Sequence, residues 1–429
     1  MAAQKWDGKS EVTYGLVGRT LGHSWSPLIH EKLGTTPYSL IELEPEDLAA
    51  FIARKDWQGL NVTMPYKTEA AKLADELTPA AERMGAVNTL WRRADGTVLG
   101  DNTDVFGFSY LLGRFLEREL DGEGSLEGAE VLVLGSGGAS RAVVAALEDA
   151  GAVPCVISRT GEDNYENLLE RHAEAELIVN TTPVGMFPKC PDSPLSRSVL
   201  ASLPELQGVL DVVYNPELTG IALEAKSLGL PAETGLAMLV GQAWKSSATW
   251  QEKELDATLI EAIEADIRKQ TRNLVLIGMP GSGKTSCGKR LSKMLGRERV
   301  DLDDAFLEAY GRTAADVIKE DGEDAFRTME TDVLAYFCAQ SSLVISCGGG
   351  VVTRPENLPL MKQNGTIVMI DRPLEELSSK GRPLSQAKGV AQLAEERMPL
   401  YRAWADEIVS CTGSADGDAL EIVSRLGLK

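Results

Sequence analysis

The segment Gly278-x4-Gly283-Lys284-Thr285 has the residue types and the spacing of a phosphate-binding P-loop. In such a loop the glycines let backbone N–H groups turn toward phosphate oxygens, and the lysine reaches the terminal phosphates. The threonine hydroxyl is a ligand for Mg²⁺. The sequence therefore predicts a site for ATP and Mg²⁺, formed by Gly281, Ser282, Gly283, Lys284, Thr285 and Ser286.

A second glycine turn, Gly135-Ser136-Gly137-Gly138-Ala139, is a variant of the dinucleotide-binding pattern. The next apolar run ends at Ser158-Arg159-Thr160, where dinucleotide folds read the adenosine ribose. Arg159 suits the 2′-phosphate of NADP, whereas an acidic residue there would select NAD. The acidic neighbours Glu162 and Asp163 oppose this preference for NADP.

Each glycine turn lies between a strand-like run and a helix-like run, which is the start of a parallel α/β unit. The helix-like runs are residues 142–150 and 286–295. The first 104 residues carry separate strand and helix signals at residues 12–17, 26–33, 38–43 and 59–62. Residues 251–269 read as an acidic amphipathic helix before a polar joint at 270–273. We therefore predict an α/β protein with two lobes followed by a third α/β domain, as the length of 429 residues also suggests.

The composition excludes several classes of protein. With 43 Lys and Arg against 64 Asp and Glu, the net charge is −21, which disfavours nucleic acid and anionic membranes as partners. No apolar run approaches the ~20 residues of a membrane span, and the start lacks the apolar core of a secretory signal. The six cysteines form no CxxC pair and the three histidines are dispersed, which argues against disulfides and a zinc site. We expect a cytoplasmic protein.

Further motifs follow the P-loop in a fixed order. They are Asp301-Leu-Asp303, Gly322-Glu-Asp-Ala-Phe-Arg327, Ser346-Cys-Gly348-Gly349-Gly350, Arg382-Pro-Leu and Arg397-Met-Pro-Leu-Tyr401. Together they resemble shikimate kinases over nearly all of residues 273–429. The resemblance implies that Asp303, Arg327, Gly349 and Arg397 bind shikimate, with Lys284 and Asp303 as catalytic groups. It also implies that Asp301 joins Thr285 near Mg²⁺ and that Arg382 is a lid arginine for ATP, in a lid shorter than is usual.

The residue types agree with these roles. Two arginines suit a carboxylate, because the guanidinium binds it bidentately. An aspartate suits neighbouring ring hydroxyls, one of which must be oriented for in-line attack on the γ-phosphate.

The N-terminal part contains a second ordered set of motifs. Before the glycine turn come Gly22-His23-Ser24-Trp-Ser26-Pro27, Gly59-Leu-Asn61-Val-Thr63-Met-Pro65-Tyr-Lys67, Gly85-Ala-Val-Asn88-Thr89 and Asp101-Asn102-Thr103-Asp104. After it come Asn180-Thr-Thr-Pro-Val-Gly185-Met186, Asp211-Val212-Val-Tyr214-Asn-Pro216 and Gly235-Leu-Ala-Met238-Leu-Val-Gly-Gln242. The set is similar to shikimate dehydrogenases across about residues 11–250.

This resemblance implies a role for each matching residue. Ser24 and Ser26 would bind the substrate carboxylate, with Thr63, Asn88, Tyr214 and Gln242 as further contacts, while Val212 and Gly235 would border NADP. Lys67 and Asp104 are the family's catalytic pair. Hydride arriving at a ketone carbon leaves negative charge on oxygen, which needs a proton or a cation within reach. His23 is interpreted as a hydrogen-bonding residue of its turn.

The two resemblances imply a bifunctional enzyme of chorismate and aromatic amino acid biosynthesis. It would reduce 3-dehydroshikimate with NADPH and then phosphorylate shikimate with ATP and Mg²⁺. The predicted boundaries are a substrate lobe at 1–104 with 234–269, a Rossmann lobe at 105–233, a linker at 270–273 and a P-loop domain at 274–429.

Two alternatives stay open. A quinate dehydrogenase that uses NAD is disfavoured by Ser26 and by the fused kinase. An inactive regulator is disfavoured by the catalytic groups and by the lack of a basic patch.

Overall fold

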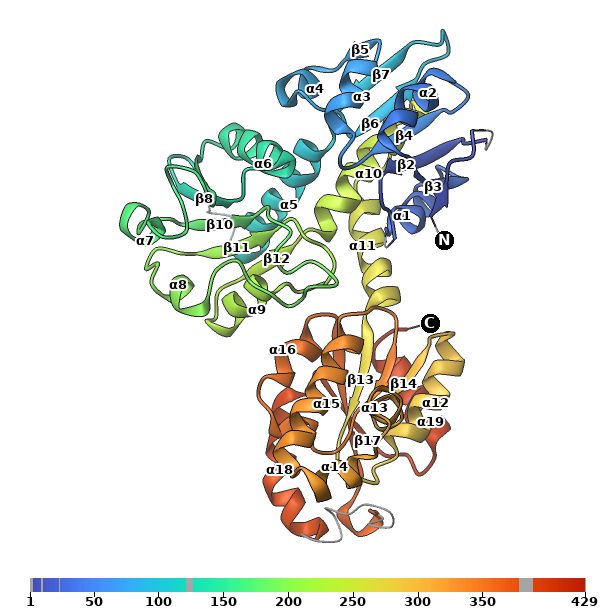
Figure 1. Cartoon of the computed structure of the whole chain (residues 1–429), viewed down its shortest axis with the longest axis vertical. Helices are drawn as coiled ribbons and strands as arrows, with labels where there is room; N and C mark the ends of the chain where they lie inside the picture. Colours follow the sequence, from blue (N-terminus) through green and yellow to red (C-terminus); the bar gives the residue numbers. More distant parts are fainter. Residues whose placement is uncertain (1–2, 9–10, 23, 121–125, 378–388, 429) are drawn as a thin grey trace. The chain divides into compact units, whose positions relative to one another are not determined.

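The computed structural model describes residues 3–8, 11–22, 24–120, 126–377 and 389–428 (Figure 1). The chain divides into two compact units. The N-terminal unit consists of Met1–Pro183, Pro194–Tyr214 and Glu224–Ile267, and the C-terminal unit of Val184–Ser193, Asn215–Leu223 and Arg268–Lys429. Within the described residues, no helix has both the length and the apolar character that a membrane crossing would require.

The first sheet of the N-terminal unit has seven strands in the order β1-β3-β2-β4-β6-β7-β5. Strand β6 runs antiparallel to its neighbours β4 and β7, and the remaining pairs are parallel. The strands are β1 (Gln4–Lys5), β2 (Tyr14–Gly18), β3 (Tyr38–Glu42), β4 (Gly59–Val62), β5 (Glu76–Leu77), β6 (Thr89–Arg92) and β7 (Val98–Asp101). The helices are α1 (Ser26–Leu33), η1 (Pro45–Asp47), α2 (Leu48–Ala53), α3 (Lys67–Leu73) and α4 (Pro79–Met84). The core beside this sheet includes Phe51, Trp57 and Leu60.

The second sheet of this unit is fully parallel, in the order β12-β11-β10-β8-β9. Its strands are β8 (Glu130–Leu134), β9 (Val153–Ile157), β10 (Leu177–Asn180), β11 (Gly208–Asp211) and β12 (Ala232–Thr234). The helices in this stretch of the chain are α5 (Asp104–Glu119), α6 (Gly138–Asp149), α7 (Leu168–Arg171), α8 (Arg197–Ala201), α9 (Gly220–Ser227), α10 (Leu236–Gln251) and α11 (Thr258–Thr271). Helix α11 packs against α1 and α10. Val131 and Val133 of β8 pack with Phe108 and Phe115 of α5 in one core. This is the predicted dinucleotide-type sheet.

The C-terminal unit is built on a five-stranded parallel sheet in the order β14-β15-β13-β16-β17. Its strands are β13 (Asn273–Ile277), β14 (Arg299–Asp301), β15 (Val344–Ser346), β16 (Gly365–Asp371) and β17 (Glu407–Ser410). Its helices are α12 (Lys284–Leu295), α13 (Leu302–Tyr310), α14 (Ala314–Glu320), α15 (Glu323–Cys338), η2 (Val351–Thr353), α16 (Asn357–Lys362), η3 (Leu374–Glu376), α18 (Val390–Trp404) and α19 (Ala415–Arg425).

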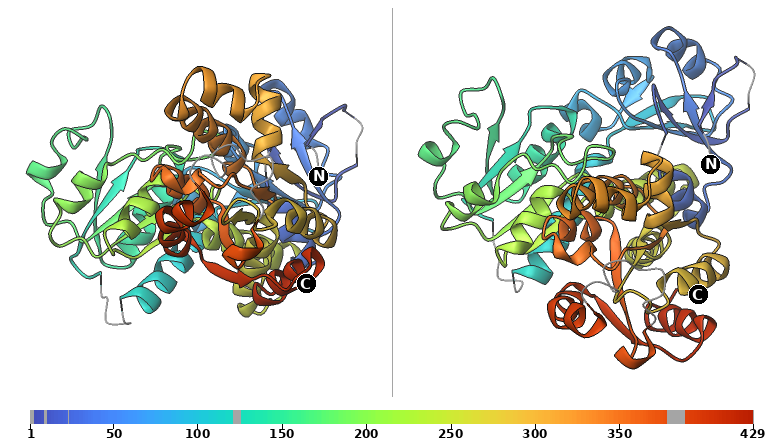
Figure 2. Two further views of the ribbon diagram at one scale, coloured as in Figure 1. Left: turned by 90° about the horizontal axis from the view of Figure 1, so that it is seen from below. Right: turned by 60° about the horizontal axis from the view of Figure 1, so that its bottom comes forward.

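Helices cover both faces of this sheet (Figure 1, Figure 2). Leu274 and Leu276 of the central strand β13 pack against α12 and α19, whereas Val275 and Ile277 join the core beneath α13, α15 and α18. A central strand of a parallel sheet is buried on both faces, which explains the unbroken apolar run before the P-loop. The predicted α/β class is confirmed in both units.

A short segment that follows β11 packs within the C-terminal unit. The backbone N–H of Glu217 donates to Asn364 Oδ1 at 2.8 Å, and that of Leu218 donates to the Gln363 carbonyl at 2.8 Å. The Glu217 carboxylate is buried and pairs with Arg268 and with Arg272, whose Nη2 donates to Oε1 at 2.6 Å. Although burial favours the neutral acid, the two arginines hold the pKa of Glu217 below its ordinary value.

The helix predicted at 251–269 is wrong in its first turns. Helix α10 ends at Gln251, and α11 begins at Thr258, where the backbone N–H donates to Asp256 Oδ1 at 2.9 Å. Glu252 has a φ of 50°, which no helix interior tolerates. At the other end α11 runs to Thr271 and β13 starts at Asn273, so the expected joint at 270–273 consists mostly of regular structure.

Candidate active sites

The N-terminal unit contains a cavity of about 220 Å³. The eight residues predicted to contact the substrate all line it: Ser24, Ser26, Thr63, Lys67, Asn88, Asp104, Tyr214 and Gln242. Three residues predicted beside the nucleotide, Ala139, Val212 and Gly235, line the same cavity. Side chains from both sheets of the unit therefore meet at one place. His23 lies outside the described residues.

The centre of this cavity is an ion pair between Lys67 and Asp104. Lys67 is the first residue of α3 and Asp104 the first residue of α5, and Nζ donates to Oδ2 at 2.5 Å. Asn88 Nδ2 donates to the other carboxylate oxygen of Asp104 at 2.8 Å and to Gln242 Oε1 at 3.2 Å. The aspartate is thus held on both oxygens, and it orients an ammonium group that borders the cavity.

The lining of this cavity also includes hydroxyl groups. Ser24 Oγ donates to Ser26 Oγ at 3.1 Å and accepts from the Ser26 backbone N–H at 3.2 Å. The Tyr214 ring packs against Trp25, with 5.2 Å between ring centroids. Burial raises the pKa of Tyr214, so its phenol is neutral and can donate a hydrogen bond. Hydroxyl donors beside an ammonium group suit a substrate that carries a carboxylate and hydroxyls.

The glycine turn between β8 and α6 fits a dinucleotide. Gly135 has a φ of 102°, and a Cβ there would lie 2.9 Å from Thr182 Cγ2, so only glycine suits the turn. At Gly137 and Gly138 an added Cβ would meet no heavy atom within 4 Å, which leaves open space at the N-terminus of α6. No side chain caps that end of the helix, whose backbone N–H groups favour an anion such as a pyrophosphate.

Arg159 is exposed and lies two residues after the end of β9. Ser158, Arg159 and Thr160 are not among the residues that line the 220 Å³ cavity. The acidic neighbours that oppose a phosphate here have another partner, because Arg171 pairs with Glu162 Oε1 at 3.0 Å and with Asp163 Oδ1 at 3.1 Å. Their charges are thereby compensated by a second arginine.

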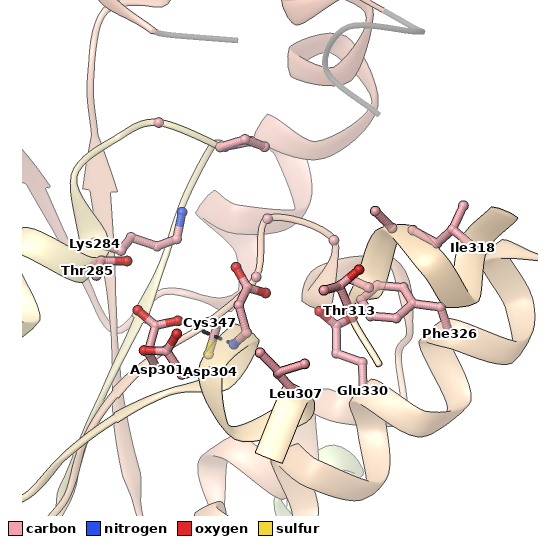
Figure 3. A pocket seen from close by; sticks show the side chains of 18 of the residues that line it. Lys284, Thr285, Asp301, Asp304, Leu307, Thr313, Ile318, Phe326, Glu330 and Cys347 are labelled. Carbon is pink, nitrogen blue, oxygen red and sulfur yellow. Dashed lines mark hydrogen bonds between the residues drawn. The ribbon is translucent and has the colours of Figure 1, made fainter. Parts of the chain in front are cut away.

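The C-terminal unit contains a cavity of about 610 Å³ (Figure 3). Ten predicted residues line it: Gly281, Gly283, Lys284, Thr285, Ser286, Asp301, Asp303, Arg327, Gly349 and Arg397. Ser282, also predicted to bind ATP, is fully buried and does not line the cavity. The predicted lid residue Arg382 lies outside the described residues.

The P-loop holds its lysine over its own backbone. Lys284 Nζ donates to the carbonyls of Gly278 and Met279 at 2.9 Å each. Helix α12 begins at Lys284 and has no side-chain cap, so its first N–H groups face the cavity as a phosphate site requires. Thr285 and Asp301 lie on the Lys284 side of the cavity in Figure 3, an oxygen pair that suits Mg²⁺.

Two arginines in the lining of this cavity suit an anion. Arg327 and Arg397 are 5% and 3% exposed, and the Nε of each is buried without a hydrogen-bond partner. Arg327 Nη1 donates to Glu330 Oε2 at 2.5 Å, while Arg397 Nη1 donates to the Gly349 carbonyl at 3.0 Å. Two buried guanidinium groups with unsatisfied N–H donors are suited to a carboxylate.

Asp303 lines the same cavity and interacts electrostatically with both Lys284 and Arg327. Burial, and then the neighbouring Asp301, raise the pKa of its carboxyl group, while Lys284 and Arg327 oppose this effect. A carboxylate with a raised pKa and an adjacent lysine can orient a hydroxyl and accept its proton.

Comparisons with known proteins give family matches for both parts of the chain. Residues 16–90 match the shikimate dehydrogenase substrate binding domain and residues 280–427 match shikimate kinase. Shikimate dehydrogenase (NADP(+)) of Clostridium beijerinckii is 33% identical over 271 residues, which cover 58% of this chain and 96% of that protein. The relative in Oleidesulfovibrio alaskensis, with the same name, is 37% identical and covers 59% and 94%. The chain belongs to the shikimate dehydrogenase family.

Solved structures show the same fold for the dehydrogenase part of the chain. A chorismate mutase/shikimate 5-dehydrogenase fusion protein from Clostridium acetobutylicum is 34% identical, with a TM-score of 0.54 and coverage of 60% of this chain and 97% of that one. Shikimate dehydrogenase 1 from Peptoclostridium difficile is also 34% identical, with a TM-score of 0.51 and coverage of 60% and 98%. Together with the kinase match, the chain is a bifunctional shikimate-pathway enzyme: an NADP-dependent shikimate dehydrogenase and an ATP- and Mg²⁺-dependent shikimate kinase.

The structure also shows polar groups that the sequence analysis missed. Glu330 is 4% exposed at the base of the kinase cavity and binds Arg327. Asn61, buried beside the dehydrogenase cavity, accepts from the Tyr38 hydroxyl at 2.8 Å. Arg372 follows β16 and its Nε donates to the Ser282 carbonyl of the P-loop at 3.3 Å. The position of Arg372 after a buried strand is a signal that the sequence contained.

Proposed function

We propose that the N-terminal unit reduces the C3 ketone of 3-dehydroshikimate to a hydroxyl with NADPH. We further propose that the C-terminal unit transfers the γ-phosphate of MgATP to that same oxygen. The observation that carries both proposals is common to the two cavities. Each is lined by cationic or hydroxyl donors that suit a carboxylate, and each is reached by residues of a glycine turn that suits a nucleotide. Gly281 and Gly283 line the kinase cavity, and Ala139, which follows the turn at residues 135–138, lines the dehydrogenase cavity.

In the dehydrogenase, Lys67 is the residue that meets the reacting oxygen. NADPH supplies the hydride when it is bound at the turn formed by Gly135, Ser136, Gly137 and Gly138. As negative charge grows on the ketone oxygen, the Lys67 ammonium stabilises it and donates a proton. Asp104 keeps Lys67 in place and accepts from a substrate hydroxyl, while Ser24 and Ser26 bind the carboxylate.

In the kinase, Asp303 orients the C3 hydroxyl and accepts its proton, while Lys284 neutralises charge on the transferred phosphoryl group. Thr285 and Asp301 are the residues that would hold Mg²⁺. Arg327 and Arg397 bind the carboxylate, which fixes the ring so that one hydroxyl faces the phosphate. The product of the first site is then the substrate of the second.

One coupled assay tests the proposal. The full chain is mixed with 3-dehydroshikimate and ATP-Mg²⁺, with NADPH or NADH, and both nicotinamide oxidation and ADP release are followed. With 3-dehydroshikimate, we expect ADP release only when NADPH is present and is being oxidised. With shikimate supplied instead, we expect ADP release without any nicotinamide cofactor. A preference for NADH, or for quinate over shikimate in the reverse reaction, would contradict the assignment of the N-terminal site.

A further inference from the structure

A cluster of metal-ligating side chains lies in the N-terminal unit, apart from the residues that line the dehydrogenase cavity. Its members are Glu130 at the start of β8, Cys155 in β9 and His172 directly after α7. One carboxylate oxygen, the thiol sulfur and one imidazole nitrogen all lie within 4.8 Å of one another. Among the described residues, no other group of three or more His, Cys, Asp and Glu side chains meets this spacing.

The fold explains how residues so distant in sequence converge. In the parallel register of β8 and β9, Glu130 lies opposite Val153 and Leu132 lies opposite Cys155, so the Glu130 and Cys155 side chains leave the same face of the sheet. The loop after β9 returns through α7, and the end of that helix brings His172 over this face. The residues are therefore fixed by three different elements of the lobe.

The imidazole of His172 faces a carboxylate on each side. Its Nδ1 contacts Glu130 Oε1, and its Nε2 lies 3.1 Å from Asp163 Oδ1. The residue is 8% exposed, and both Nε2 and Asp163 Oδ1 are buried without a hydrogen bond of good geometry. Arg171 Nη1 approaches Asp163 Oδ1 at 3.1 Å, so Asp163 has a cationic neighbour. Glu130 contacts the imidazole and also interacts with the Cys155 thiol.

We propose that Glu130, Cys155 and His172 Nδ1 form a binding site for a thiophilic divalent cation of the Zn²⁺ class. One carboxylate, one thiolate and one imidazole are the ligand types that Zn²⁺ takes, with water in the fourth position. Mg²⁺ and Ca²⁺ are disfavoured because they prefer oxygen ligands alone. On binding, the Cys155 thiol releases its proton to water, since the thiolate is the ligand.

Asp163 has the position of an orienting residue in this site. When Nδ1 of a histidine binds a metal, the other ring nitrogen carries a proton and commonly donates it to a carboxylate. His172 Nε2 and Asp163 Oδ1 are already at a suitable separation of 3.1 Å. The backbone carbonyl of Asp163 accepts from the Ser158 N–H at 3.1 Å, so the cation site is connected to the residue that precedes Arg159.

The simplest competitor is an imidazolium that bridges two carboxylates without any metal. The imidazolium would neutralise the carboxylates of Glu130 and Asp163, but this state would not involve Cys155. The thiol therefore distinguishes the two states, and a spectroscopic signal from sulfur decides between them.

The test is a Co²⁺ titration of the full chain after removal of metals by a chelator, with a phosphine as reductant. Excess Mg²⁺ and ADP occupy the kinase site throughout. We expect a thiolate-to-cobalt charge-transfer band that saturates at one equivalent and that Zn²⁺ abolishes. The band should be absent in Cys155→Ser and present in Cys190→Ser, because Cys190 is a second half-buried cysteine outside the cluster.

Zn²⁺ affinity, measured by competition with a chromophoric chelator, gives a second readout. Loss of the ligand in His172→Gln should weaken binding at least about 100-fold, and Asp163→Asn should weaken it roughly 10- to 100-fold through the imidazole. Absence of the band in wild type, its persistence in Cys155→Ser, or unchanged Zn²⁺ affinity in His172→Gln would each overturn the proposal. If a variant does not fold, the wild-type titration decides.

Discussion

Glu330 accepts a hydrogen bond from Arg327 Nη1 at 2.5 Å, and both side chains are buried at the base of the kinase cavity. Burial raises the pKa of Glu330 and Arg327 opposes this effect, so the carboxyl depends on the arginine for its charge. In turn, the carboxylate fixes the guanidinium that would bind the substrate. Arg327 also meets Glu323, but at 3.3 Å and near solvent.

We therefore expect Glu330→Gln to raise the KM for shikimate roughly ten- to a hundredfold, because it removes a charge-assisted hydrogen bond of about 1.5–3 kcal/mol. Glu323→Gln is the matched control: it contacts the same arginine but is 39% exposed, and it should change this KM by less than about fivefold. The KM for ATP should be nearly constant in both variants. Equal effects of the two substitutions on shikimate would contradict the positioning role.

Lys67→Ala should lower dehydrogenase turnover by about 10²–10⁴-fold, because the reacting oxygen loses its proton donor. Lys72→Ala, on the same helix but 67% exposed, should leave turnover within about twofold. Kinase activity on added shikimate should be retained in both variants. Lys284→Ala should give the reverse pattern, with phosphorylation lost and reduction kept. Near wild-type reduction by Lys67→Ala would exclude Lys67 as the acid.

Arg159→Ala should raise the KM for NADPH about ten- to a hundredfold, because a charge-assisted pair with the 2′-phosphate contributes on the order of 1.5–3 kcal/mol. The KM for NADH serves as the internal control and should change little, since NADH has no phosphate at that position. Steady-state kinetics with both cofactors measure the effect. If both KM values rise in parallel, Arg159 does not read the phosphate.

Arg397→Ala should weaken shikimate binding by about 2–5 kcal/mol, because the substrate carboxylate would be buried with one partner missing. Arg402 lies on the same helix, but its side chain is 61% exposed, so Arg402→Ala is a control that should change the KM for shikimate within about twofold. Titration against shikimate and ATP in turn gives four KM values. An effect of Arg397→Ala on ATP alone would place this arginine at the nucleotide.

The pH dependence of the kinase should report Asp303. Its folded-state pKa is raised, so it gains a proton at a higher pH than an ordinary aspartate at about 3.9. The acid limb of kcat/KM for shikimate should therefore lie above that value, with activity lost as the pH falls through it. Asp303→Asn should remove most activity and abolish this limb. A wild-type limb at or below the ordinary value would show that Asp303 is not the titrating group.

Local sequence signals were sufficient for much of the fold. Helix α1 coincides with the predicted residues 26–33, because Pro27 suits a first turn and Gly34 adopts a φ of 78° at the end. Strand β4 coincides with residues 59–62. The interruption between α10 and α11 was not predictable from amphipathic spacing, since a charged stretch such as 252–257 reads alike as an exposed helix turn or as a loop.

The site residues also divide into those that the sequence predicted and those that it did not. Motif order selected most of the side chains that line both cavities. Lys67, Asp104 and Lys284 are the first residues of helices, whereas Gln242, Arg327 and Arg397 lie within helices. Glu330 was missed because a glutamate three residues after an arginine reads as an exposed helix pair, and its burial depends on the packing of α15. The dispersion of the histidines argues against a metal site, yet the parallel register of β8 and β9 and the end of α7 bring residues 130, 155 and 172 together.

The C-terminal unit is discontinuous in sequence, and this affects whether the two activities can be separated into two genes. Two of its segments, Val184–Ser193 and Asn215–Leu223, are encoded within the dehydrogenase half, and Glu217 in the second is buried against Arg268 and Arg272. During synthesis these segments leave the ribosome before the strands of the kinase sheet, so they can pack in their final places only after that sheet has formed. A gene cut at a single codon near 270 would leave Glu217 on one product and Arg272 and Asn364 on the other.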